Sequence, residues 1–133
     1  MLQDVLSAAI KQRFPEIEFT SHSPHGAAIV IWAKHSEVGD ISIWDDGDEA
    51  TVELGGITHG HVADYTPHTS EDQAFRLISE AVILFLERLF ADRVLFWKTA
   101  SGGGGWRVLQ DQEFPQVRSD PGTQYYLWSG PLE

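Results

Sequence analysis

The chain has 133 residues, of which 42% are hydrophobic and 22% charged, and this length is enough for one globular domain with a substantial core. Twenty acidic against nine basic residues give a formal charge of −11, so a phosphate backbone would be repelled and nucleic acid is not expected as a ligand. Because the chain has no cysteine, disulfides, thiolate zinc sites and cysteine nucleophiles are excluded.

The sequence also carries no sign of membrane targeting. Residues 1–5 lack a basic region followed by an apolar run, so they do not form a signal peptide. The longest apolar run of the helical region, residues 81–86, is too short to span a bilayer. We therefore expect a soluble cytoplasmic protein without membrane association, folded as a single domain over residues 1–133 with a looser segment over 110–133.

The first elements are predicted from apolar periodicity. Apolar residues at helical spacing predict an amphipathic helix over residues 2–14, which ends before Pro15. Alternation at period two over residues 16–20 predicts a short strand. The continuous apolar run at 27–33 predicts a central strand that is covered on both faces.

Residues 40–54 predict one β-hairpin, because Asp46-Gly47 is a strong turn signal. A turn centred on these two residues gives one apolar and one polar face. The expected cross-strand pairs are Ile41 with Val52, Ile43 with Ala50, Ser42 with Thr51, and Trp44 with Glu49. A slip of one residue would scramble both faces, so the pattern predicts this register.

Four further strands and a long helix complete the pattern. A helix over residues 70–90 is predicted to begin at Thr69 or Ser70, whose hydroxyl can accept a hydrogen bond from a free amide. Its apolar stripe is wider than one face, so we expect burial on more than one side, against the core or a partner. Strands are predicted at residues 57–62, 94–97, 106–109 and 124–128. The prediction is an α+β domain, with a largely antiparallel sheet and both helices packed on it.

Four acidic residues surround the predicted hairpin turn: Asp45, Asp46, Asp48 and Glu49. Calcium loops of the EF-hand type are flanked by helices, whereas strands flank this turn, so a calcium loop is not expected. An exposed acidic tip would attract a basic protein surface and accelerate its association. These four residues are the candidate partner-binding site.

His59 and His61 are two residues apart, so on a strand both imidazoles point to the same face, as in many metal sites. A metal site needs further ligands, and nothing in the sequence places one beside this pair. The residues available as a third ligand are His22, His25, His35, Asp45 and Asp48. The sequence alone favours the simpler interpretation, in which Gly60 marks a tight bend and the histidines bond to backbone. A metal site at His59 and His61 stays open as the alternative, and no cofactor is predicted.

No catalytic residue is predicted. The chain contains no Gly-x-Ser-x-Gly elbow, and Ser101 has no identifiable base. The glycine run at 102–105 lacks the lysine of a phosphate loop and leads into a strand, which indicates a hairpin loop. Glu80 and Glu87 share one helix face, where solvation explains them.

Three strings resemble an uncharacterised family of small acidic bacterial α+β proteins: residues 43–49, 58–61 and 90–94. In size, acidity and predicted fold class the chain is also similar to immunity proteins that neutralise secreted toxins, a resemblance of class that implies no residue roles. The first hypothesis is a non-enzymatic protein-binding module, such as an immunity-type inhibitor of a basic toxin. The alternatives are a metal- or small-ligand-binding protein centred on His59 and His61, including a hydrolase, and a structural subunit of a homo-oligomer such as a homodimer.

Overall fold

The computed structural model describes residues 2–21, 25–63, 70–115 and 121–132. These residues form two helices, α1 (Leu2–Arg13) and α2 (Glu71–Phe90), and nine strands in two antiparallel sheets. The α+β class and both predicted helices are confirmed. The prediction of one sheet is wrong, because the strands after α2 form a sheet of their own.

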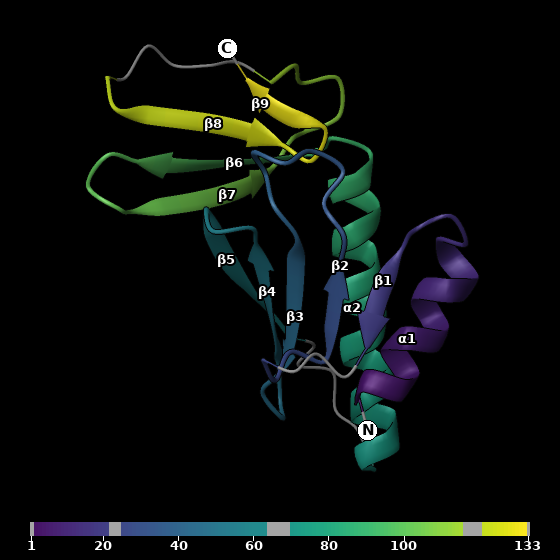
Figure 1. The fold of residues 1–133 in the computed structure, drawn as a ribbon. Helices are drawn as coiled ribbons and strands as arrows, with labels where there is room; N and C mark the ends of the chain where they lie inside the picture. The colour runs from purple at the N-terminus through teal and green to yellow at the C-terminus, as the bar shows by residue number, and fades with distance from the viewer. Residues whose placement is uncertain (1, 22–24, 64–69, 116–120, 133) are drawn as a thin grey trace.

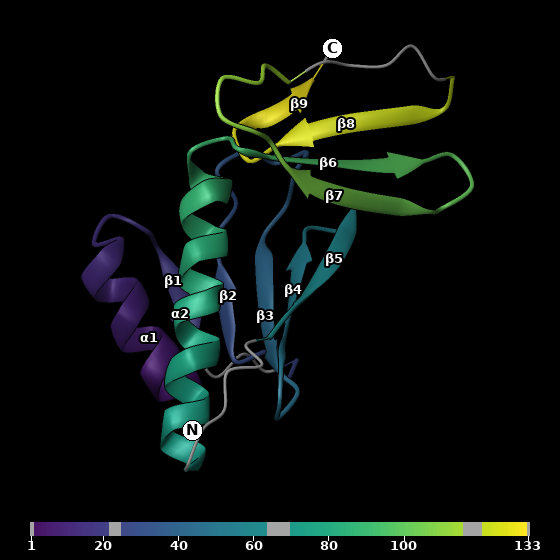
Figure 2. The same cartoon turned by 180° about the vertical axis from the view of Figure 1, so that it is seen from behind.

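The first sheet has five strands in chain order, and both helices cover one of its faces while no helix covers the other (Figures 1 and 2). The strands are β1 (Phe19–Ser21), β2 (Ile29–Ile31), β3 (Ile41–Asp45), β4 (Ala50–Leu54) and β5 (Thr58–Val62). We call the uncovered face the outer face. The prediction that β2 is central and covered on both sides is wrong, since it lies next to the edge and Val30 on the outer face is only half-buried.

The second sheet has four strands in the order β7-β6-β8-β9 and lies across one end of the first sheet, beside the C-terminal end of α2 (Figure 1). Its strands are β6 (Val94–Thr99), β7 (Gly104–Val108), β8 (Thr123–Leu127) and β9 (Gly130–Leu132). Strand β9 was not predicted, because its Gly-Pro-Leu sequence shows no apolar alternation. The glycine run at 102–105 is divided between the β6–β7 turn and the start of β7.

The core forms between the first sheet and α2, whose inward side chains Ile78, Val82 and Leu86 are at most 2% exposed. A second side of α2 packs against α1, where the ring of Phe14 meets Phe90 edge to face at 5.0 Å. Burial of α2 on two sides is therefore confirmed, and α1 supplies the second cover. Among the large apolar side chains described on α2, Leu84 alone is mostly exposed, at 55%.

The beginning of α2 follows from its cap. The hydroxyl of Ser70 accepts a hydrogen bond from the backbone N–H of Gln73 at 3.1 Å, so Ser70 is the N-cap. The other predicted cap, Thr69, lies outside the described residues. Glu71 and Asp72 in the first turn and Arg88 in the last turn complement the helix dipole.

The β3–β4 hairpin has the predicted faces but a register shifted by two residues. Ile41, Ile43, Ala50 and Val52 are all 0% exposed, as predicted. The pairs predicted for them are wrong. The observed pairs are Ile41 with Leu54, Ser42 with Glu53, Ile43 with Val52, Trp44 with Thr51, and Asp45 with Ala50. A shift of two leaves every side chain on its own face, and it adds Leu54 to the buried set.

The shift originates in the turn. The backbone N–H of Asp48 donates to the carbonyl of Asp46 at 3.2 Å across Gly47, whose φ of +88° suits a γ-turn. The Asp45 carboxylate accepts the N–H of Gly47 at 2.9 Å, and Asp46 N–H donates to the carbonyl of Glu49 at 3.0 Å. The turn is therefore centred one residue later than the Asp-Gly signal predicts, on residues 47 and 48.

Candidate functional site at the acidic hairpin

The negative charge of the chain is concentrated in one stretch. Residues 35–75 contain ten of the twenty acidic residues and none of the nine lysines and arginines. The rest of the chain is almost neutral, with ten acidic and nine basic residues. Seven of the ten lie within residues 35–62, which form β3, β4 and β5 with their turns, and Glu71 and Asp72 lie in the first turn of α2.

Gly60 explains why both histidines of β5 face outward. It pairs with Val52 in a regular ladder, so the predicted tight bend is wrong. A Cβ at Gly60 would lie 2.7 Å from Nε1 of Trp106, which packs on the inner face of β5. Because the inner face has no room for a side chain, glycine is required there and the imidazoles of His59 and His61 lie on the outer face. Their rings meet edge to face at 5.2 Å.

The structure brings His61 together with two carboxylates of the hairpin tip. One ligand atom each from Asp46, Glu49 and His61 lies within 4.8 Å of the other two. Nδ1 of His61 is 3.3 Å from Oε1 of Glu49 and 3.2 Å from Oγ1 of Thr51. The Thr51 hydroxyl in turn donates to Oδ2 of Asp46. We call Asp46, Glu49 and His61 the tip cluster.

The other candidate ligands that the structure describes, Asp45, Asp48, His25, His35 and His59, do not join the tip cluster. Asp45 is used within the turn, where it accepts the N–H of Gly47, and Asp48 is exposed at the tip. Nδ1 of His35 accepts the N–H of Glu37 at 3.1 Å, and its ring packs beside the Gly130 backbone. His22 lies outside the described residues.

The sequence missed this convergence because of the register. Pairing Trp44 with Glu49 places the Glu49 side chain in the ladder, away from Asp46. In the observed register Asp46 and Glu49 bond across the end of the hairpin, and Thr51 lies opposite His61 on β5. The two candidate sites predicted separately, the acidic tip and the histidine pair, therefore meet at one point.

The tip cluster does not have the geometry of a nucleophilic triad. In a triad the imidazole uses one nitrogen for the nucleophile and the other for the acid. Here Thr51 and Glu49 both approach Nδ1 of His61, and Thr51 directs its hydroxyl proton to Asp46. The arrangement is a hydrogen-bonded polar network at the hairpin tip.

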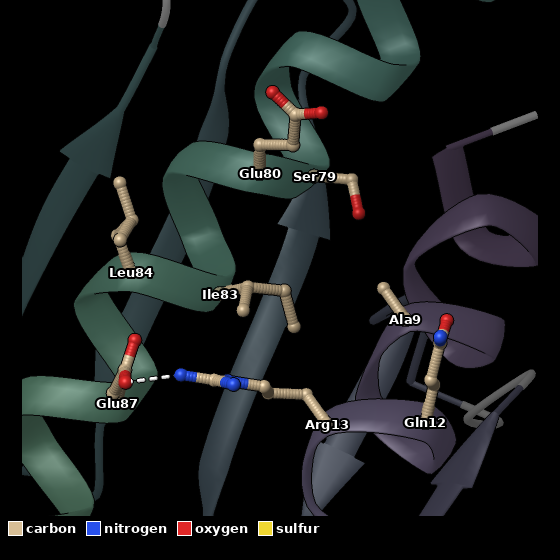
Figure 3. Close-up of a pocket in the computed structure, with 8 residues that line it drawn as sticks. All are labelled: Ala9, Gln12, Arg13, Ser79, Glu80, Ile83, Leu84 and Glu87. Carbon is tan, nitrogen blue, oxygen red and sulfur yellow. Dashed lines mark hydrogen bonds and ion pairs between the residues drawn. The ribbon is translucent and has the colours of Figure 1, made fainter.

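A groove lies between α1 and α2, with a volume of about 580 Å³. Figure 3 shows Arg13 extending from α1 to Glu87 on α2 below Ile83, with Ser79 and Glu80 on the preceding turns. Both partners of this ion pair are about half exposed, at 55% and 44%, so solvent screens it. The groove brings together no set of groups suited to catalysis.

The four-stranded sheet carries a different kind of charged contact. The guanidinium of Arg107 on β7 binds both carboxylate oxygens of Glu113, and Gln110 donates its backbone N–H to the same carboxylate at 2.8 Å. The hydrogen bond from Arg107, followed by the one from Gln110, lowers the pKa of Glu113 to about 2. This contact joins β7 to the segment that follows it.

Comparison with known proteins gives no relative. The chain matches no family model, no curated protein and no solved structure. No helix in the described part of the chain combines the length and apolar character that a bilayer span requires. The assignment of a function therefore depends on the charge distribution and on the tip cluster.

Proposed function

We propose that this protein is a non-enzymatic binding module that captures a basic surface of a partner protein through its acidic hairpin, as an immunity-type inhibitor captures a basic toxin. The observation that carries the proposal is the separation of charge along the chain. The stretch 35–75 has ten acidic residues and no lysine or arginine, while the remainder is nearly neutral. Charge added for solubility alone would not need to be confined to one part of the fold.

The position of the acidic residues suits an encounter surface. The β3–β4 turn lies at the end of the first sheet remote from the second sheet (Figure 1), where nothing in the second sheet shields it. Behind the turn, Ile43 and Val52 are fully buried and hold the hairpin on the core. Exposed charges act over about 8 Å at physiological salt, so a fixed acidic tip would accelerate the approach of a basic protein. We expect this capture to occur in the cytosol.

The partner can be sought with a photoreactive amino acid at two positions. One variant carries it in place of Asp48 at the tip, and the control carries it in place of Ala100, an exposed residue after β6. We expect the Asp48 variant to cross-link one basic protein in host cells and the Ala100 variant not to do so. A partner that cross-links only at Ala100, or an acidic partner, would contradict the proposal.

Binding kinetics with that partner then test the role of the tip. The tip variant replaces Asp45, Asp46, Asp48 and Glu49 by their amides. A charge-matched control replaces Glu16, Glu18, Glu80 and Asp111 by theirs, all exposed and outside residues 35–75. We expect the association rate to fall about tenfold or more in the tip variant and to change little in the control. If the association rate falls equally in both variants, the effect is due to net charge alone and the hairpin is not part of the interface.

A further inference from the structure

The tip cluster holds two carboxylates close together, and among the described residues neither forms an ion pair with a lysine or arginine. The ligand atoms of Asp46 and Glu49 lie within 4.8 Å of each other, and the chain has no lysine or arginine between residues 35 and 75. Two like charges at this distance repel unless a cation lies between them. The group beside both is the imidazole of His61, which can act as a protonated cation or as a neutral metal ligand.

The geometry suits the second role. A tetrahedral zinc ion with bonds of about 2.0 Å holds its ligand atoms roughly 3.3 Å apart. Nδ1 of His61 and Oε1 of Glu49 are 3.3 Å apart, and an oxygen of Asp46 lies within 4.8 Å of both atoms. Small side-chain rotations would therefore bring all three atoms onto one ion.

The surroundings of the cluster also suit a metal ion. The hydroxyl of Thr51 donates to Asp46, and metal-binding carboxylates are commonly oriented by such hydrogen bonds. The backbone below His61 is fixed, because β5 pairs with β4 and Gly60 packs against Trp106. Asp45 and Asp48 add negative charge on the same turn, which raises the local concentration of cations.

We propose that Asp46, Glu49 and His61 form a divalent transition-metal site with an open position for water, suited to zinc. Nδ1 of His61 would bind the ion through its lone pair as a neutral imidazole, with the ring proton on Nε2. The ligand set of one imidazole and two carboxylates favours zinc over calcium or magnesium, which prefer oxygen ligands alone. An occupied site would lower the negative charge of the hairpin tip.

This inference does not depend on partner capture. Zinc titration needs no partner, and the association kinetics can be measured with a chelator present. The failure of one proposal therefore leaves the other testable. The zinc site therefore goes beyond the proposed partner capture, although zinc binding and partner capture use the same turn.

The test is calorimetric titration of zinc into tag-free protein that has first been stripped with a chelator. We expect one zinc per chain and calcium binding much weaker than zinc. His61→Ala and Glu49→Gln should each weaken zinc binding by at least about tenfold, since the loss of even a supporting group around a metal costs 10- to 100-fold. Asp48→Asn is the matched control, because it removes one charge from the same turn and no ligand, and it should stay within about twofold.

Three results would overturn the site. The first is no saturable binding of zinc at one per chain. The second is an equal loss in the Asp48→Asn and Glu49→Gln variants, which would reduce the effect to diffuse charge. The third is retention of zinc affinity in His61→Ala, provided that each variant keeps the unfolding midpoint of the parent.

Discussion

The two sheets of this protein place their charges in opposite ways. On the four-stranded sheet, Arg107 meets Glu113 in a two-pronged contact, and a backbone N–H adds to it. On the five-stranded sheet, the stretch 35–62 that forms β3, β4 and β5 with their turns has seven acidic residues and no lysine or arginine. A carboxylate paired with a guanidinium contributes to the fold, whereas a concentration of carboxylates without lysine or arginine costs stability through repulsion. Folding accounts for the first arrangement, and the proposed capture of a basic partner would account for the second.

The largest expected effect tests whether the hairpin is held by its buried face. Ile43→Asp places a carboxylate at a position that is 0% exposed, with no cation described beside it. We expect a loss of about 3–5 kcal/mol in the free energy of unfolding, measured with denaturant. Ser42→Asp on the outer face of the same strand is the control and should change stability by less than about 1 kcal/mol. Similar losses in both variants would contradict the assigned faces.

The next effect tests the contact between the two sheets. Gly60→Val would force a side chain into Trp106, whose ring also meets Phe85 edge to face at 5.1 Å. We expect a destabilisation of about 2–3 kcal/mol from overpacking. His59→Val is the control on the opposite face of the same strand, where β-branched residues are well accepted. A Gly60→Val protein as stable as its parent would show that Trp106 does not pack on β5.

The paired carboxylate gives a pH-dependent prediction. Because the pKa of Glu113 is lowered to about 2 from an ordinary value of 4.5, its ionised form stabilises the folded state. This contribution is complete above about pH 4.5, declines as the pH falls and is lost near pH 2. We expect Glu113→Gln to lower the unfolding temperature at pH 7. The difference from the parent should shrink between pH 4.5 and 2.

The smallest effect concerns an acidic residue of the other sheet. Asp48→Asn removes an exposed charge that lies among others of the same sign, so the unfolding free energy should stay within about 0.5 kcal/mol of the parent or rise slightly. Thermal unfolding of Asp48→Asn and Glu113→Gln, run together at low salt, compares the two sheets directly. A clear loss of stability in Asp48→Asn would contradict the assignment of the tip to binding.

Local sequence predicted most of the architecture. Helical periodicity and the Pro15 boundary identified α1, and Ser70 with its acidic first turn identified the beginning of α2. Alternation at period two assigned the buried face of the hairpin correctly. These features depend on neighbours in the chain, which a sequence displays.

What the sequence could not predict depends on contacts between distant residues. The γ-turn at Gly47 shifts the hairpin register by two residues. Such a shift leaves every side chain on the same face, so the alternation of apolar and polar residues does not reveal it. The role of Gly60 required Trp106, which lies on the other sheet. The contact between Glu49 and His61 depends on the shifted register and on the outward direction of the histidines that Gly60 imposes. A count of charge along the chain would have found the stretch 35–75 in advance, whereas the net charge conceals it.

The central claim is that the acidic hairpin serves to capture a basic partner, and the salt dependence of the association rate tests it most directly. With the cross-linked partner, the association rate of the parent should fall steeply as salt rises, while the dissociation rate changes much less. In the variant neutralised at Asp45, Asp46, Asp48 and Glu49, most of that salt dependence should disappear. An association rate of the parent that does not depend on salt, or a variant with the same dependence as the parent, would contradict the account.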